Sequence, residues 1–190
     1  KVDFLINKLK EDASIALVSD AGMPLISDPG EIIVKKAKDN NIDVICIPGP
    51  CAALSALVSS GLDTSKFTFY GFIPRSTFLR KSILKEIWES KNTSIIYESP
   101  KRILKLLVDL KEICGEDRKV VLMKELTKRF EKHYGNSIKD VIKEIELKEP
   151  KGEFTLILSG NNKNELVRDR SLIEDLKELI KAGLSHSSAS

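Results

Sequence analysis

The residues best suited to chemistry lie where an apolar run ends in "SDAGMP", residues 19–24. Asp20 stands at the predicted end of a strand, where an aspartate can bind a ribose hydroxyl, an amine or a metal ion. The glycine and proline that follow let the backbone approach a ligand closely and fix the turn that presents it. A plain strand-end turn is the alternative for Asp20. Asp28 precedes a predicted helix at 31–41, and we expect it to cap that helix.

A second loop of this kind, "PGPC" at residues 48–51, follows the apolar run 42–47. If both runs are strands joined by the helix 31–41, their carboxyl ends lie side by side, where open α/β sheets bind ligands. The spacing matches neither the G-x-G-x-x-G pattern nor the Walker loop, so a dinucleotide or a nucleoside triphosphate has no support. These residues alone predict a small-ligand site at a sheet edge.

The elements that must position these loops follow from apolar runs of strand length that alternate with helical periods. Such an alternation predicts βαβ units, parallel strands and an α/β fold. The expected strands are residues 14–19, 42–47, 93–99, 119–126 and 153–160, with an aromatic strand within 62–74. The expected helices are residues 4–11, 31–41, 52–61, 76–90, 100–113, 136–148 and 171–182.

A break near residue 67 predicts two α/β lobes. We expect residues 1–66 to form a partial N-terminal cofactor-binding lobe and residues 67–162 a C-terminal lobe, with a linker and the start of a helical segment at 163–190. Because Lys1 is not a start methionine and the chain stops in "GLSHSSAS", we expect a fragment with an incomplete first lobe.

Composition is that of an ordinary globular protein, with 42% hydrophobic and 31% charged residues in a chain of 190. The start does not resemble a signal peptide, and the longest weakly polar stretch, residues 51–62, is too short to span a bilayer. Cys46, Cys51 and Cys114 show no C-x-x-C spacing, so we expect neither disulfides nor zinc. A reducing cytoplasm is the expected location.

Charge is spread unevenly although the net charge is only +3. Residues 68–132 carry 15 basic and 9 acidic side chains, while the segments on either side are slightly acidic. A basic middle third indicates a local anionic partner such as RNA. The alternative is that lysine-rich helices simply present their outer faces to water.

Several segments, in order, resemble the tetrapyrrole methylase superfamily, and within it the enzymes that methylate a cytidine 2′-hydroxyl of small-subunit ribosomal RNA. These segments are "LVSDAGMPLISDPG", "IPGPCAALSALVSSGL", "FYGFIPR", "YESPKRI", "KELTKRFE" and "KGEFTLIL". The resemblance covers roughly residues 1–185. It implies two α/β lobes with a cleft for S-adenosylmethionine between them, a homodimer, and 16S ribosomal RNA or the small subunit as partner. It implies no metal.

The same resemblance assigns the cofactor to three stretches of the chain. These are Ser19, Asp20, Ala21, Gly22, Met23 and Pro24 in the first loop, Pro48, Gly49, Cys51 and Ala52 in the second, and Gly152 and Glu153 near the adenine. Ordinary turn chemistry explains the last two almost as well. The sequence departs from the family at Met23, where threonine is usual, and the family's glycine-rich first strand and "EDTR" segment are absent.

Methyl transfer to a 2′-hydroxyl is helped by a base that removes the proton, and the alignment of hydroxyl and methyl supplies much of the rate. Glu98 and Glu125 stand at predicted strand ends, and a desolvated Lys124 is a third candidate. Phosphates favour arginine and lysine. The candidate RNA contacts are Arg75, Lys101, Arg102, Lys128 and Arg129.

Three other functions stay open at this point. The first is a methyltransferase of the same superfamily that acts on a small, tetrapyrrole-like molecule. The second is a non-catalytic RNA-binding fragment. The third is a receiver-like module in which Asp20 accepts a phosphoryl group, which the neighbours Ala21, Gly22 and Pro24 disfavour because they supply no acidic cluster.

Overall fold

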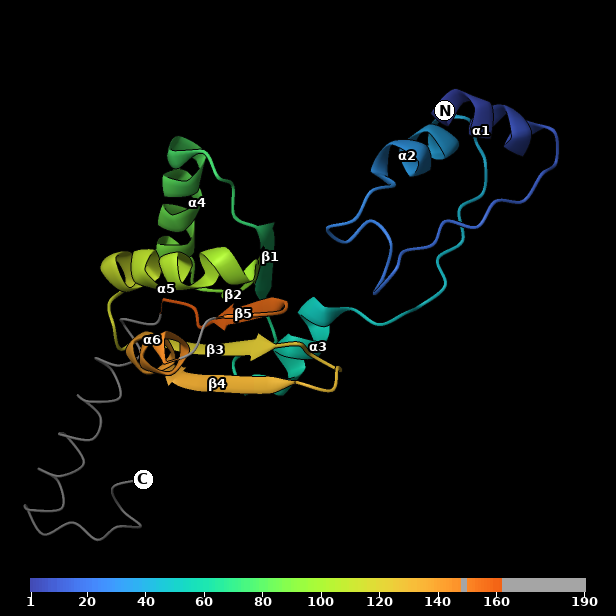
Figure 1. The fold of residues 1–190 in the computed structure, drawn as a ribbon. Coiled ribbons are helices and arrows are strands. Elements are labelled where there is room, and N and C mark those ends of the chain that lie inside the picture. The colour runs from blue at the N-terminus through green and yellow to red at the C-terminus, as the bar shows by residue number, and fades with distance from the viewer. Residues whose placement is uncertain (148–149, 162–190) are drawn as a thin grey trace, which may run out of the picture.

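The computed structural model describes residues 1–147 and 150–161 (Figure 1). The helices are α1 Val2–Lys10, α2 Glu31–Asp39, α3 Ala52–Ser59, α4 Thr77–Glu89, α5 Pro100–Cys114 and α6 Ile138–Glu146. The strands are β1 Phe67–Phe72, β2 Thr93–Glu98, β3 Lys119–Lys124, β4 Lys132–Ser137 and β5 Phe154–Leu158. The predicted α/β class is confirmed. The helix predicted at 171–182 and the segment 163–190 lie outside the described residues.

The five strands form one sheet in the order β1-β2-β5-β3-β4. Only β1 and β2 pair in parallel, whereas β5 runs antiparallel to both of its neighbours and β4 runs antiparallel to β3. The prediction of parallel strands therefore holds for β1 and β2 and was wrong for the other three pairs. β5 reads "FTLIL" and all five residues are buried, which suits the centre of a sheet whichever way its neighbours run.

Helices cover both faces of this sheet unequally. The larger core lies on the face that carries Ile96 and Leu122, where α4, α5 and α6 pack. α6 places Ile138, Val141, Ile142 and Ile145 on that core at helical spacing. On the opposite face α3 packs Ala53, Ala56 and Leu57 against Ile95, Met123 and Ile157, and it is the one helix on that face among the described residues.

The N-terminal residues lie to one side of the sheet (Figure 1). There α1 and α2 pack together, with Ile6 and Ala37 buried and Lys36 ion-paired to Asp3. The segments 14–19 and 42–47 were predicted as strands, and the structure contradicts this because neither pairs with a strand among the described residues. Most of their apolar residues are exposed, including Val18 and Ile45 at 82% each. A strand requires a hydrogen-bonded neighbour, and the apolar pattern alone does not supply one.

Strand β4 was not predicted from the sequence. It reads "KHYGNS", lies at the edge of the sheet and buries only Tyr134 and Ser137. A polar edge strand lacks the apolar alternation that marks a strand in the sequence. Within the described residues, none of the helices is both long and apolar enough to cross a membrane.

Candidate functional site

The two loops singled out in the sequence contact each other. A Cβ atom built on Gly22 would lie 3.6 Å from the Pro50 carbonyl oxygen, and one built on Gly49 would lie 3.6 Å from Met23 Cγ. Gly22 has φ of +76°, a conformation that side chains disfavour, so glycine is required there. The predicted proximity of residues 19–24 and 48–52 is thus confirmed, although the strands expected to carry them do not form.

Within the first loop, Ser19 and Asp28 hold the backbone together. Ser19 Oγ lies 2.6 Å from Asp28 Oδ2 and 2.9 Å from the Ala21 carbonyl oxygen, so its one hydroxyl hydrogen is shared between two acceptors. Gly30, not Asp28, is the N-cap of α2, and no side chain caps that helix. The predicted capping role of Asp28 was therefore wrong. Asp20 is exposed at the loop surface.

The second loop is fixed to the sheet through Tyr97, which sequence reasoning missed. The backbone N–H of Ala53, in the first turn of α3, donates to Tyr97 Oη at 2.9 Å. Burial raises the pKa of Tyr97, and the proximity of Cys51 and Asp28 raises it further. Tyr97 thus lies near Cys51 of the second loop and near Asp28, which accepts a hydrogen bond from Ser19 of the first loop. The only signal in the sequence was an aromatic residue one position before the end of a strand.

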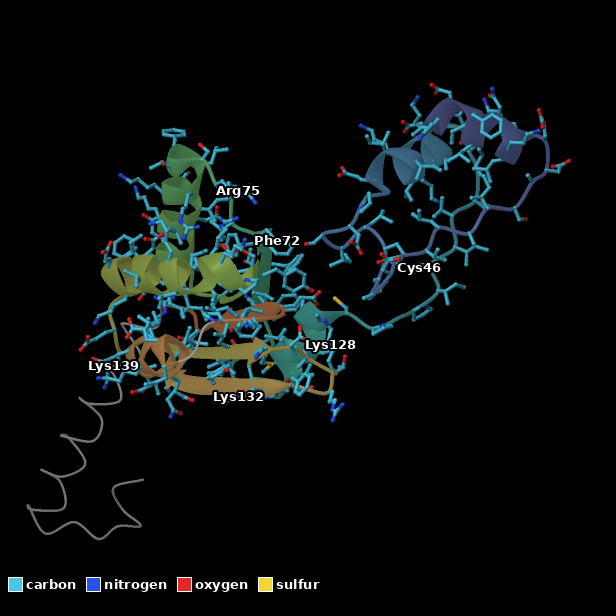
Figure 2. All side chains as sticks on the ribbon, in the orientation of Figure 1. Cys46, Phe72, Arg75, Lys128, Lys132 and Lys139 are labelled. Atoms are coloured by element: carbon cyan, nitrogen blue, oxygen red, sulfur yellow. The ribbon has the colours of Figure 1, made fainter. Side chains whose placement is uncertain are left out.

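Aromatic rings surround this junction. The Tyr97 ring packs edge-on against Phe69, with centroids 5.0 Å apart, and against Phe72, with centroids 5.7 Å apart. A Cβ on Gly71, which has φ of +60°, would lie 3.3 Å from Ser27 Oγ, so the residues that follow the first loop reach the end of β1. Figure 2 shows Phe72 at that end, on the side of the N-terminal residues that carry Cys46. The candidate site therefore lies where the two loops meet the carboxyl ends of β1 and β2.

The candidate bases Glu98 and Lys124 lie in one row across the sheet, because both pair with Phe154 of β5. Phe154 belongs to the core under α5, so the row faces that helix. The Glu98 side chain is fully buried, accepts the Ser99 N–H at 2.7 Å and lies 3.2 Å from Arg102 Nη2. Its negative charge at the start of α5 also suits the helix dipole.

Glu125, the third candidate base, belongs to a separate network. Its carboxylate accepts the Glu153 N–H at 2.9 Å and lies 3.2 Å from Lys128 Nζ, which is also 3.0 Å from Glu153 Oε2. The hydrogen bond from Glu153 and the charge of Lys128 hold the pKa of Glu125 below its ordinary value. A carboxylate with a lowered pKa is a weaker base. The structure thus joins three residues that were predicted to have three different roles.

The predicted RNA contacts separate into two groups. Lys128 and Arg129 lie on the loop after β3, where Arg129 lies over the Phe130 ring at 5.5 Å. Lys101 is exposed in the first turn of α5. Arg75 and Arg102 line a cavity together with Arg80 and Lys105, two residues that the sequence did not single out for binding. Among the described residues, no group of three or more His, Cys, Asp or Glu side chains could hold a metal ion.

Residues 1–142 match the sequence model of the family described as "Tetrapyrrole (Corrin/Porphyrin) Methylases". Among curated relatives, the protein named "Ribosomal RNA small subunit methyltransferase I" of Haemophilus influenzae is 44% identical over 168 residues, which cover 87% of this chain and 59% of that protein. The protein of the same name from Synechocystis is 38% identical over 188 residues, or 98% of this chain and 67% of that protein. The chain therefore spans about three fifths to two thirds of the length of these relatives.

Solved structures share the fold at low sequence identity. The methyltransferase CobJ aligns with a TM-score of 0.64 and 14% identity over 84% of this chain and 70% of that chain. The cobalt precorrin-4 methyltransferase CbiF aligns with a TM-score of 0.58 and 16% identity over 83% of this chain and 69% of that chain. At such identities the likeness concerns the fold alone.

Proposed function

The chain belongs to the tetrapyrrole methylase family, and we propose that the full-length protein transfers a methyl group from S-adenosylmethionine to the 2′-hydroxyl of a cytidine in small-subunit ribosomal RNA. The observation that carries this proposal is the 38–44% identity, over 83% or more of the chain, to relatives named ribosomal RNA small subunit methyltransferase I. The basic segment 68–132 supports an RNA substrate independently.

The residues at the junction of the two loops suit such a cofactor. Exposed Asp20 offers a carboxylate to the ammonium group of the methionine part, as a charge-assisted hydrogen bond. Gly22 and Gly49 keep both backbones free of side chains where the loops touch, so that a ligand can approach them closely. Gly152 and Glu153, proposed to lie near the adenine, are held in place by Glu125.

When bound, S-adenosylmethionine supplies an electrophilic methyl group. The protein's part is to align the ribose hydroxyl with that methyl and to accept the hydroxyl proton. Glu98, Glu125 and Lys124 are the proposed bases. The pKa of Glu125 is lowered by the Glu153 N–H and by Lys128, which makes it a weaker base than an ordinary glutamate. The Glu98 carboxylate is engaged by Ser99 and Arg102.

The proposal has four further parts. RNA contacts come from Arg75, Lys101, Arg102, Lys128 and Arg129. The chain divides into lobes after residue 66, a homodimer is the functional unit, and no metal takes part in the reaction. The location is cytoplasmic, where small ribosomal subunits are the partner.

Labelled-methyl transfer from S-adenosylmethionine to small subunits and to naked ribosomal RNA tests the activity. We expect incorporation into RNA, at a cytidine ribose, with the full-length protein. Asp20→Ala is expected to lower the affinity for S-adenosylmethionine in calorimetry, whereas Asp39→Ala, on the exposed end of α2, leaves it unchanged. A full-length protein that binds the cofactor but labels no form of the RNA would refute the proposed substrate.

Glu98→Gln, Glu125→Gln and Lys124→Met test the base. Removal of a general base typically slows turnover by about 10²–10⁴-fold. The variant that loses turnover to this extent and keeps its affinity for S-adenosylmethionine identifies the base, and three variants with wild-type turnover would exclude all three. A tetrapyrrole-like substrate is distinguished by salt, because its binding would respond to salt far less than that of RNA.

A further inference from the structure

A cavity of about 180 Å³ opens beside the carboxyl ends of β1 and β2, and its lining is entirely cationic. Arg75 lies between β1 and α4, Arg80 on α4, and Arg102 and Lys105 on α5. The space equals roughly six water molecules of liquid volume, enough for a phosphate group and part of its hydration shell. Figure 2 shows Arg75 next to Phe72, on the same side of the sheet edge as the N-terminal residues.

The carboxylates nearby neutralise only part of this charge. Arg80 Nε donates to Asp109 Oδ2 at 2.8 Å, and Lys105 Nζ lies 3.4 Å from Asp109 Oδ1. Arg102 pairs with Glu98. Two carboxylates therefore face four cations. Among the described residues Arg75, which is exposed, forms no ion pair.

Arg80 is the most buried residue of this lining. The residue is only 8% exposed, and its Nη2 is buried without a well-oriented hydrogen bond. Nη2 lies 2.7 Å from Asp109 Oδ2, the same oxygen that accepts the Nε–H. Arg80 therefore contributes its positive charge to the lining, while its guanidinium is engaged by Asp109. The ion pair to Asp109 links α4 to α5, and it leaves Arg75 as the lining residue with no ion pair among the described residues.

We propose that this pocket binds one backbone phosphate of the RNA substrate, an inference that rests on the proposed function. Guanidinium groups match a phosphate with two parallel hydrogen bonds, and three of the four lining residues are arginines. Two exposed aromatic residues bracket Arg75 in the chain, Phe72 at 53% and Phe78 at 81% exposure. Such rings are platforms on which unpaired bases stack, which favours a polynucleotide over a free anion.

The decisive experiment compares two double variants of equal charge in the full chain. Arg75→Ala with Lys105→Ala removes exposed members of the pocket, while Lys81→Ala with Lys85→Ala removes exposed charges elsewhere on α4. Fluorescence anisotropy of a labelled small-subunit RNA fragment is followed over a salt series. The pocket variant is expected to bind at least tenfold more weakly, with a salt slope smaller by up to two. The control is expected to change affinity by less than threefold.

A phosphate titration identifies the source of the anion. In the wild-type chain, the Nε–H signals of Arg75 and Arg102 are followed by NMR, first with inorganic phosphate and then with the RNA. We expect both ligands to shift the same signals. Shifts with phosphate alone would overturn the proposal, since the pocket would then serve a free anion. Equal RNA binding by the pocket variant and the wild type would also overturn it, whereas a wild type that binds no RNA would refute the proposed function itself.

Discussion

At the scale of single residues, two features of the structure disfavour a side chain at Gly152. Its φ is +92°, and a Cβ there would lie 2.6 Å from Glu125 Cγ and Oε1. In Gly152→Ala, Glu125 must move and give up the Glu153 N–H. We expect a loss of about 1–3 kcal/mol from backbone strain and about 1–2 kcal/mol more from that hydrogen bond.

Gly115→Ala is the matched control for this variant. Gly115 has φ of +88°, but a Cβ there would meet no atom within 4 Å. The control therefore carries the strain without the collision. Urea unfolding measures the free energy of unfolding of both variants. Equal losses would show that the Glu125 side chain moves away from the added methyl group at position 152 without loss of stability.

Glu125 also predicts a dependence of stability on pH. Its pKa is lowered from 4.5 in the folded chain, first by the Glu153 N–H and then by Lys128. A lowered folded pKa gives stability that is present above pH 4.5 and is lost as the pH falls through the folded value. Glu125→Gln is therefore expected to melt below the wild type at pH 7, and the difference is expected to shrink toward pH 3.

Thermal unfolding of both proteins at pH 7, 5 and 3 provides the measurement. Glu89→Gln serves as the reference, because Glu89 pairs with Lys85 at 3.8 Å on the surface. Exposed pairs of this kind contribute about 0–1 kcal/mol. A gap between wild type and Glu125→Gln that stays constant over the whole range would contradict the prediction.

At the scale of elements, the N-terminus of α6 depends on its serine cap. Ser137 Oγ accepts the Asp140 N–H at 3.3 Å and donates its own hydrogen to Asp140 Oδ2. Ser137→Ala is expected to destabilise the protein by about 1 kcal/mol. Ser76 occupies the same N-cap position in α4 without a side-chain cap bond, so Ser76→Ala should cost only a few tenths of that amount. Chemical denaturation of the two variants tests the difference, and similar losses would refute the role of the cap.

The sequence was informative about elements and less so about their partners. The amphipathic periods of α5 and α6 and the apolar runs of β2, β3 and β5 were predicted nearly in full. Pairing direction was not, because a strand buried on both faces looks the same in parallel and antiparallel sheets. The runs 14–19 and 42–47 show the same limit of sequence patterns. An apolar run indicates that a segment can form a strand, but it does not indicate which strand it pairs with.

The candidate site was predicted to a similar depth. The Gly- and Pro-containing loops predicted the contact between residues 19–24 and 48–52 from the sequence alone, and the structure has this contact. Tyr97 and Arg80 were not predicted as part of the site, because each acts through a contact between elements that are distant in the chain. No local spacing encodes such a contact. Glu125 was identified, but its ties to Lys128 and Glu153 appear only in the folded chain.

At the scale of the whole molecule, α3 joins the N-terminal loops to the sheet. Its apolar side packs on the face opposite α4, α5 and α6, and its first turn donates to Tyr97. The N–H groups in the first turn of a helix have no partner within the helix, so Tyr97 Oη satisfies one that would otherwise need water. Loss of this hydrogen bond should therefore destabilise α3 and the adjoining residues 48–52 before it affects the rest of the sheet.

Tyr97→Phe removes this acceptor and keeps the ring contacts with Phe69 and Phe72. One hydrogen bond contributes about 1 kcal/mol, so we expect amide exchange in α3 to accelerate about fivefold while β3 and β5 keep their protection. Tyr70→Phe is the control, because its hydroxyl donates to Glu86 of α4 at 3.2 Å and its ring packs on the opposite core. Amide exchange that accelerates equally in α3 and β5 would mean that Tyr97 supports the whole fold. Exchange in α3 that accelerates equally in both variants would mean that the effect is not specific to Tyr97. Either result would contradict a role of Tyr97 at the junction between the loops and the sheet.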